Sequence, residues 1–162
     1  GQALHAFDYD VLKKRAGVHT GALGLESASP RVYPALKKKL GPEQIGRAAR
    51  SAIDAGLEVE FFSQYALPGE TLGDAMLTLK FVKQCGVKIQ GNSNAQQMQL
   101  YFGSKIYDGF SRHGVRPLRD SFPAYLSPGT EFETEWMSAA DIQKVKKAWR
   151  AESLDGGKRV VS

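Results

Sequence analysis

The spacing of apolar residues along the chain predicts five helices. Apolar side chains recur every three or four positions in several stretches, which is the period of an amphipathic helix. Glycines close most of these stretches, as expected at helix ends. Ser29 followed by Pro30 is a strong start signal for one of them. We expect the helices at residues 8–16, 29–39, 42–56, 72–86 and 138–150.

Apolar runs between the helices predict three strands: at residues 18–25, at residues 57–66, and from residues 87–89 into the polar stretch 90–99. Strands that alternate with helices indicate βα units and a parallel sheet, so the expected fold class is α/β. Three such strands alone would leave much apolar surface exposed, because a parallel sheet is normally covered on both faces and contains more strands. We therefore expect the C-terminal portion of a βα barrel or open sheet. Residues 1–110 would form this part.

Residues 111–162 differ in pattern. Pro117, Pro123, Pro128 and several glycines predict an irregular arm over residues 111–135. The last helix follows, with Ser138 as its cap and Asp141 in the capping-box position. We expect a frayed tail from residue 154 onward.

Composition narrows the setting of the protein. The chain has 162 residues and is 42% hydrophobic, enough for a core. It has no apolar run near 18 residues and no signal-peptide pattern, so we expect a cytoplasmic protein without a membrane partner. The single Cys85 excludes an internal disulfide and any site with several thiolates. The three histidines lack metal-ligand spacing, so no metal site is predicted.

The net charge of +5 comes from short basic runs. These runs fall near predicted helix ends, where cations complement the helix dipole. A nucleic-acid groove would instead place them on one surface with interleaved aromatic residues. The pattern therefore argues against a nucleic-acid partner and favours solvated helix faces.

Two motifs follow successive predicted strands. Gly24–Ser27 ends the first strand and Leu67–Thr71 ends the second, so both would lie at the same mouth of a barrel. Pro68 and Gly69 form a tight turn, and Thr71 caps the next helix with Asp74 three residues on. A plain βα turn explains the second motif without any ligand.

The two glutamates of these motifs also have plain explanations. Glu26 could complement the dipole of the helix that starts at Pro30. A carboxylate in a first helical turn, as at Glu70, is common.

These motifs resemble the second half of the radical S-adenosylmethionine superfamily. GLESASPRVYPALKK is followed by PEQIGRAARSAIDAGLEVEFFSQYALPGET and a helix. The order matches that superfamily's strand ending in G-x-E-S, helix pair, strand ending in G-x-P-G-E-T, and helix. The resemblance covers residues 8–102. Each motif is weakly specific alone, and the ordered set is more specific.

The resemblance implies a partial (β/α)6 TIM-like barrel. It also implies a [4Fe–4S] cluster on C-x3-C-x2-C and S-adenosylmethionine on the unique iron. Reductive cleavage then yields a 5′-deoxyadenosyl radical that abstracts hydrogen from a small-molecule substrate. Glu26 and Ser27 would meet the amino-acid and ribose part, and the backbone of residues 65–69 would follow the adenine. The implied cofactor-binding residues are Gly24, Glu26, Ser27, Tyr65, Ala66, Leu67, Pro68, Gly69 and Glu70.

The chain departs from the superfamily at two points. Ala66 stands where the superfamily usually has glycine, and its methyl would narrow the approach to adenine. More importantly, Cys85 alone cannot hold a cluster. We therefore expect the segment that binds the iron–sulfur cluster to lie in the N-terminal part of the same parent enzyme. That N-terminal part is the expected partner of this chain. The chain alone would be inactive.

Two further segments carry expectations. The segment FPAYLSPGTEFETEW resembles C-terminal segments of members with a cobalamin-binding domain, which suggests cobalamin as a further cofactor. The third strand leads into amides that would face the substrate, although a polar strand end and loop would look the same. These residues are Gln90, Asn92, Asn94 and Gln96.

The sequence thus predicts a fragment of a radical S-adenosylmethionine enzyme that contributes cofactor and substrate contacts. Two other functions stay open. One is another barrel or open-sheet enzyme that binds a phosphate or sugar at the strand ends. The other is a non-catalytic domain whose basic helices bind an acidic partner, with steep salt dependence.

Overall fold

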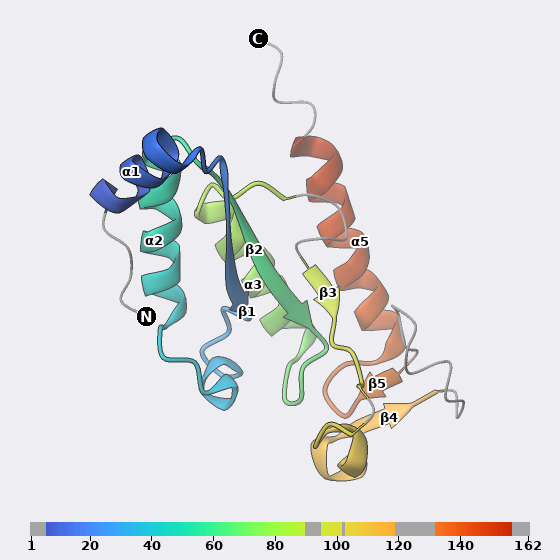
Figure 1. Cartoon of the computed structure of the whole chain (residues 1–162). Coiled ribbons are helices and arrows are strands. Elements are labelled where there is room, and N and C mark those ends of the chain that lie inside the picture. The colour runs from blue at the N-terminus through green and yellow to red at the C-terminus, as the bar shows by residue number, and fades with distance from the viewer. Residues whose placement is uncertain (1–5, 90–94, 102, 119–131, 157–162) are drawn as a thin grey trace.

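The computed structural model describes residues 6–89, 95–101, 103–118 and 132–156. Its centre is a parallel sheet in the order β1-β2-β3, shown in Figure 1. The strands are β1 (Thr20–Glu26), β2 (Glu58–Tyr65) and β3 (Ala95–Gln97). Helix α2 (Pro42–Asp54) joins β1 to β2, and α3 (Leu72–Gln84) joins β2 to β3. The predicted α/β class with βα units is confirmed.

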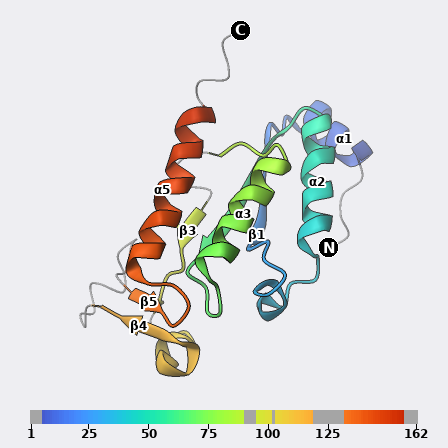
Figure 2. The same cartoon turned by 180° about the vertical axis from the view of Figure 1, so that it is seen from behind.

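The described helices cover one face of the sheet. Helices α2 and α3 pack on the strands, and α5 (Ala139–Gly156) packs against α3 and β3. Helix α1 (Ala6–Ala16) lies against α2, and Figure 2 shows α2, α3 and α5 in front of the sheet. No helix among them is long and apolar enough to cross a lipid bilayer.

Alternation along β2 explains which face is covered. Val59, Phe61 and Tyr65 are buried, and the Phe61 ring stacks on Phe81 of α3 with centroids 6.5 Å apart. Phe62 and Gln64 point the other way and are exposed. In Figure 1 this second face of the sheet has no described helix over it. The sheet therefore has one packed face and one open face.

The helix side of the sheet carries one continuous apolar core. Leu25 and Phe61 from the sheet, and Val82 from α3, are fully buried. Ile142 and Val145 of α5 join the same cluster. The final helix is thus part of the helical layer that covers the sheet. The Asp141 amide donates to Ser138 Oγ at 3.2 Å, which confirms the predicted cap of this helix.

The predicted irregular arm contains a small antiparallel pair. Strand β4 (Val115–Pro117) pairs with β5 (Phe132–Thr134). In Figure 1 this pair lies near the end of the sheet to which β2 points. Residues 119–131, with most of the segment linked to cobalamin, lie outside the described part.

Three sequence predictions were wrong in extent. Residues 29–39 form a short 3₁₀ turn at Tyr33–Leu36 in place of a helix, because Pro34 cannot donate within a helix and Lys37 adopts a left-handed conformation. Residues 87–89 are not a strand, since the third strand forms later, at β3. The last helix continues to Gly156, because alanine, glutamate and leucine after Arg150 favour helix.

Replacing Lys37 by glycine is expected to raise the free energy of unfolding by about 1 kcal/mol. Lys37 is exposed and has φ +51°, a conformation in which its Cβ is strained. Glycine removes that strain, and no buried packing is lost. Urea denaturation would measure the change. Lys39→Gly is the matched control, because Lys39 is exposed without a positive φ. Equal effects of both substitutions would contradict the prediction.

Candidate functional site

The carboxyl ends of β1 and β2 lie side by side and form the candidate site. All nine residues predicted to bind a cofactor lie at these two ends. Each strand reaches a residue in the left-handed conformation: Glu26 has φ +63° at the end of β1, and Ala66 has φ +61° directly after β2. The backbone therefore turns sharply after both strands, at the same edge of the sheet. We call the two turns, residues 24–31 and 66–71, the mouth loops.

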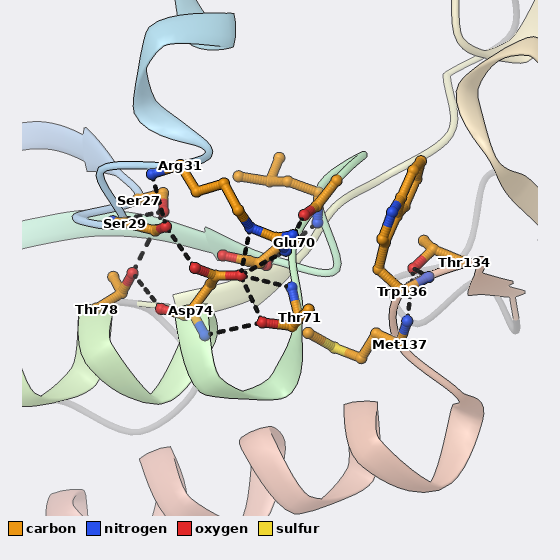
Figure 3. Close-up of polar contacts among 12 residues, drawn as sticks. Ser27, Ser29, Arg31, Glu70, Thr71, Asp74, Thr78, Thr134, Trp136 and Met137 are labelled. Carbon is orange, nitrogen blue, oxygen red and sulfur yellow. Dashed lines mark hydrogen bonds and ion pairs between the residues drawn. The ribbon is translucent and has the colours of Figure 1, made fainter.

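Buried hydroxyl groups tie the first mouth loop to helix α3. Ser27 Oγ lies 3.3 Å from Thr78 Oγ1, and Thr78 Oγ1 also accepts a hydrogen bond from the Ala28 amide at 3.0 Å. Ser27 Oγ further accepts from the Ser29 amide at 3.2 Å. Figure 3 shows this chain of contacts crossing from the β1 end to α3. Ser27, which is fully buried, thus has a structural partner that the sequence did not reveal.

Asp74 joins both mouth loops. Its carboxylate accepts from Ser29 Oγ at 2.6 Å and from the Thr71 amide at 2.9 Å, so the predicted Thr71–Asp74 capping box is confirmed. Arg31 Nη2 reaches the same carboxylate at 2.7 Å and also donates to the Gly69 carbonyl oxygen (Figure 3). Despite partial burial, the hydrogen bonds from Ser29, Thr71 and Arg31 hold the pKa of Asp74 far below its usual value.

Glu70 differs from Asp74, because its environment raises the pKa of its carboxyl group. Its side chain is 0% exposed, and Oε2 accepts a hydrogen bond from the Leu67 amide at 3.2 Å. Oε1 has no hydrogen-bond partner within the described part of the chain. Burial raises the pKa of this carboxyl to about 7, opposed by the Leu67 and Ala66 amides and assisted by the charge of Asp74. The Ser27 hydroxyl lowers the pKa least.

Glu26 forms an ion pair that the sequence did not suggest. Lys38 Nζ lies 2.9 Å from Glu26 Oε1 and donates to the Gly24 carbonyl oxygen at 2.7 Å. The left-handed backbone of Glu26 allows this pairing across the first mouth loop. Lys38 belongs to a basic run that we had expected on a solvated helix face. The Glu26 carboxylate stays partly accessible, with 25% of its side chain exposed.

The second mouth loop has a buried beginning and an accessible tip. Tyr65, Ala66 and Leu67 are buried, whereas Pro68 and Gly69 are half-buried. Burial raises the pKa of the Tyr65 hydroxyl. The tip of the turn is therefore the part of this loop that a ligand can reach without rearrangement.

The third predicted group is only partly described. Gln90, Asn92 and Asn94 lie outside the described residues. Gln96 lies in β3, exposed and in register with Gln64 of β2, so the two amides share the open face of the sheet. A substrate-facing role for Gln96 stays a prediction.

Cys85 lies away from the mouth, at the C-terminal end of α3. The thiol is buried, and Arg50 Nη1 is 3.7 Å from its Sγ. No group of three or more metal-binding side chains occurs in residues the structure describes. Because this thiol stands alone, these residues do not fit an iron–sulfur cluster.

A tight turn before α5 is a further feature that sequence reasoning missed. The Met137 amide donates to Thr134 Oγ1 at 3.0 Å, which buries Met137 and leaves Trp136 38% exposed. Figure 3 shows this turn at the same edge of the sheet as Glu70. The threonine two residues before Trp136 was the available signal, because threonine hydroxyls often close such turns.

Comparison with curated proteins shows a similarity to a methyltransferase. The chain is 33% identical over 86 residues to an uncharacterized methyltransferase of Pyrococcus horikoshii. The matched part is 52% of this chain and 19% of that protein, so this chain spans far less than the length of its relative. No family model matches the chain.

Proposed function

We propose that this chain is part of a radical S-adenosylmethionine enzyme and forms the C-terminal half of its partial (β/α)6 barrel. The observation that carries the proposal is the junction of the two mouth loops. GLES and LPGET, the two motifs of the resemblance, meet at adjacent strand ends and are joined through Asp74. In α/β folds, ligands bind outside the carboxyl ends of the strands.

The open face of the sheet supports the barrel part of the proposal. A barrel keeps its helices outside and turns the other face of its strands inward. Here α2, α3 and α5 lie on one face, and Phe62, Gln64 and Gln96 are exposed on the other. In the proposed barrel these side chains line the interior and face the substrate. The remaining strands would come from the N-terminal part of the same enzyme.

The methyltransferase relative supports the choice of ligand. S-adenosylmethionine is a common methyl donor, and the relative is named as a methyltransferase. In the proposed site, Glu26 accepts hydrogen bonds from ribose hydroxyls or an ammonium group of the ligand. These hydrogen bonds replace part of the ion pair between Glu26 and Lys38. The tip of the second mouth loop, at Pro68 and Gly69, presents its backbone to the adenine. The bound cofactor supplies the 5′-deoxyadenosyl group for hydrogen abstraction.

The iron–sulfur cluster belongs to the parent enzyme in this proposal. Cys85 is buried and single, so the chain contributes no cluster ligand. We expect a C-x3-C-x2-C motif in the polypeptide that precedes this chain, and sequencing the upstream coding region tests that expectation. Cobalamin stays a prediction from residues 122–136, most of which lie outside the described part.

Binding of S-adenosylhomocysteine to the full chain tests the ligand part. We expect saturable binding by calorimetry and at least about tenfold weaker binding for Glu26→Ala, because a hydrogen bond to a charged group contributes about 1.5–3 kcal/mol. Glu58→Ala is the matched control, since Glu58 pairs with Lys88 at the opposite end of β2.

Intact binding by Glu26→Ala would show that the assigned role of Glu26 is wrong. If S-adenosylhomocysteine fails to bind while inorganic phosphate binds, the phosphate-binding alternative is favoured and the proposal fails.

A further inference from the structure

Trp136 is an exposed aromatic side chain on a firmly bonded turn. The Thr134 hydroxyl accepts hydrogen bonds from the amides of Trp136 at 3.3 Å and Met137 at 3.0 Å. The Thr134 amide also donates to the Met137 carbonyl oxygen at 3.0 Å, and Met137 is buried in the core. Trp136 nevertheless remains 38% exposed. The turn therefore presents this ring to solvent on a fixed base.

Gly114 provides the surface on which the Trp136 ring lies. Its φ is +60°, and the Glu135 amide donates to its carbonyl oxygen at 2.8 Å. A Cβ atom at Gly114 would come within 2.5 Å of Trp136 Cζ3, closer than a real Cβ atom approaches a neighbour. Both the left-handed backbone and the lack of space require glycine here. Close backbone packing therefore fixes the ring in addition to the turn.

The Glu135 carboxylate lies beside this ring. A Cβ atom at Gly114 would also be 3.1 Å from Glu135 Oε2, so the carboxylate and the ring flank the same point. Glu135 is exposed, and its side chain has no partner among the residues that the structure describes. Glu133, in contrast, pairs with Arg116 and accepts from the Ala139 amide at 3.4 Å. An unpaired carboxylate thus lies next to an exposed aromatic ring.

These two groups together have the chemistry of a site for an organic cation. A single exposed tryptophan would need no explanation, because isolated apolar side chains are common on protein surfaces. Here the ring is fixed and has a carboxylate beside it. Aromatic faces, that of tryptophan above all, attract ammonium groups, and quaternary ammonium ligands are recognised in this way. A neutral ligand would gain nothing from the carboxylate, and an anion would be repelled by it.

We propose that Trp136 and Glu135 form a binding site for a substituted ammonium group, which lies against the indole ring and pairs with the carboxylate. The turn lies at the same edge of the sheet as the mouth loops (Figure 3). The inference rests on the proposed function only in assigning the cation to the small-molecule substrate, because that function places the substrate at this edge. The site would then select substrates by charge.

Proton NMR titration of the full chain with choline chloride tests the site without any adenosyl compound. The ring current of an aromatic side chain shifts nuclei that lie over its face upfield. We therefore expect a saturable upfield shift of the choline methyl protons. The analogue of choline in which an uncharged carbon replaces the nitrogen should show no saturable shift.

Three variants separate the contributions of the ring and the carboxylate. Trp136→Leu should lose the upfield shift and bind choline about two- to fivefold more weakly, as for a cation–π contact at an exposed site. Glu135→Gln should keep the upfield shift, bind about two- to fivefold more weakly, and lose salt dependence. Glu43→Gln, which removes the same charge from an exposed carboxylate on α2, is the matched control and should bind like wild type.

The fold of each variant is verified by circular dichroism. Trp136→Phe keeps an aromatic ring and should retain an upfield shift, so it distinguishes loss of the ring from local disorder. An unchanged shift in Trp136→Leu, equal binding of the uncharged analogue, or no saturable shift in wild type would overturn the site.

A second titration, with S-adenosylhomocysteine present at saturation, tests the assignment to the substrate. Choline binding should be unchanged. Competition would show that the site holds the ammonium group of the adenosyl ligand itself and would overturn the assignment. Failure of S-adenosylhomocysteine to bind, with choline still bound at Trp136, would contradict the proposed function alone, because choline carries no adenosyl group.

Discussion

At pH 8, the Glu70→Gln variant is expected to be more stable than the wild-type chain by about 3 kcal/mol. The fold raises the pKa of Glu70 from 4.5 to about 7. The folded state therefore holds its proton more tightly than the unfolded state. Its contribution to stability is complete below pH 4.5 and is lost as the pH rises to 7. The neutral glutamine has no charge to bury and avoids this loss.

Urea denaturation at pH 5, 6, 7 and 8 measures the difference. The two proteins should differ by less than about 1 kcal/mol at pH 5, half a unit above the pKa of the unfolded state, and the difference should grow by about 1.4 kcal/mol per pH unit up to the folded-state pKa. Glu58→Gln, at an exposed position, should parallel wild type. A constant difference between Glu70→Gln and wild type over this range would show that Glu70 does not ionise near neutrality in the folded state.

The sequence predicted well those features that depend on residues close together in the chain, namely helices, caps and tight turns. Helices α2 and α3 have clear apolar periods and start signals, and both formed within two residues of the predicted bounds. The Thr71–Asp74 box and the turn at Pro68 and Gly69 depend on neighbours in sequence. Such features are set by backbone propensity and capping, so a single sequence reveals them.

The errors came from contacts between distant residues. Ser29 has the pattern of a helix cap, but its hydroxyl donates to Asp74, 45 positions away, and the backbone after it makes a 3₁₀ turn. Strand β3 is three residues long and pairs only with the last residues of β2, so its position depends on the sheet more than on its own sequence. No pattern within one segment encodes these partners.

In the candidate site, too, the sequence predicted the local motifs but not the contacts between distant residues. The motifs placed the nine residues at the two strand ends, where the structure has them. The sequence did not distinguish the two carboxylates near the start of α3. For Glu70 burial outweighs the hydrogen bonds that it accepts, whereas for Asp74 the hydrogen bonds outweigh burial, and this difference depends on the fold around them. Two acids four positions apart thus have opposite pKa shifts.

Replacing Asp74 by alanine is expected to lower the free energy of unfolding at pH 7 by about 3 kcal/mol. The substitution removes the side-chain half of the capping box, although Thr71 stays as the N-cap, and it leaves the Ser29 hydroxyl and the Thr71 amide without their acceptor. It also frees Arg31, which is 53% exposed and contributes less. Because both mouth loops meet at this carboxylate, adenosyl-ligand binding should weaken as well.

Asp141→Ala provides the matched control for Asp74→Ala. Asp141 forms a similar capping box with Ser138, but it is less buried than Asp74 and bonds to Ser138 and Lys144 instead of to the mouth loops. Its removal should therefore have a clearly smaller effect on unfolding and none on ligand binding. Asp74→Asn adds a pH test. The fold lowers the pKa of Asp74, so the advantage of wild type over Asp74→Asn is present above pH 4 and declines as the carboxylate is protonated in acid. Equal losses from Asp74→Ala and Asp141→Ala would show that the junction between the mouth loops adds nothing beyond an ordinary helix cap.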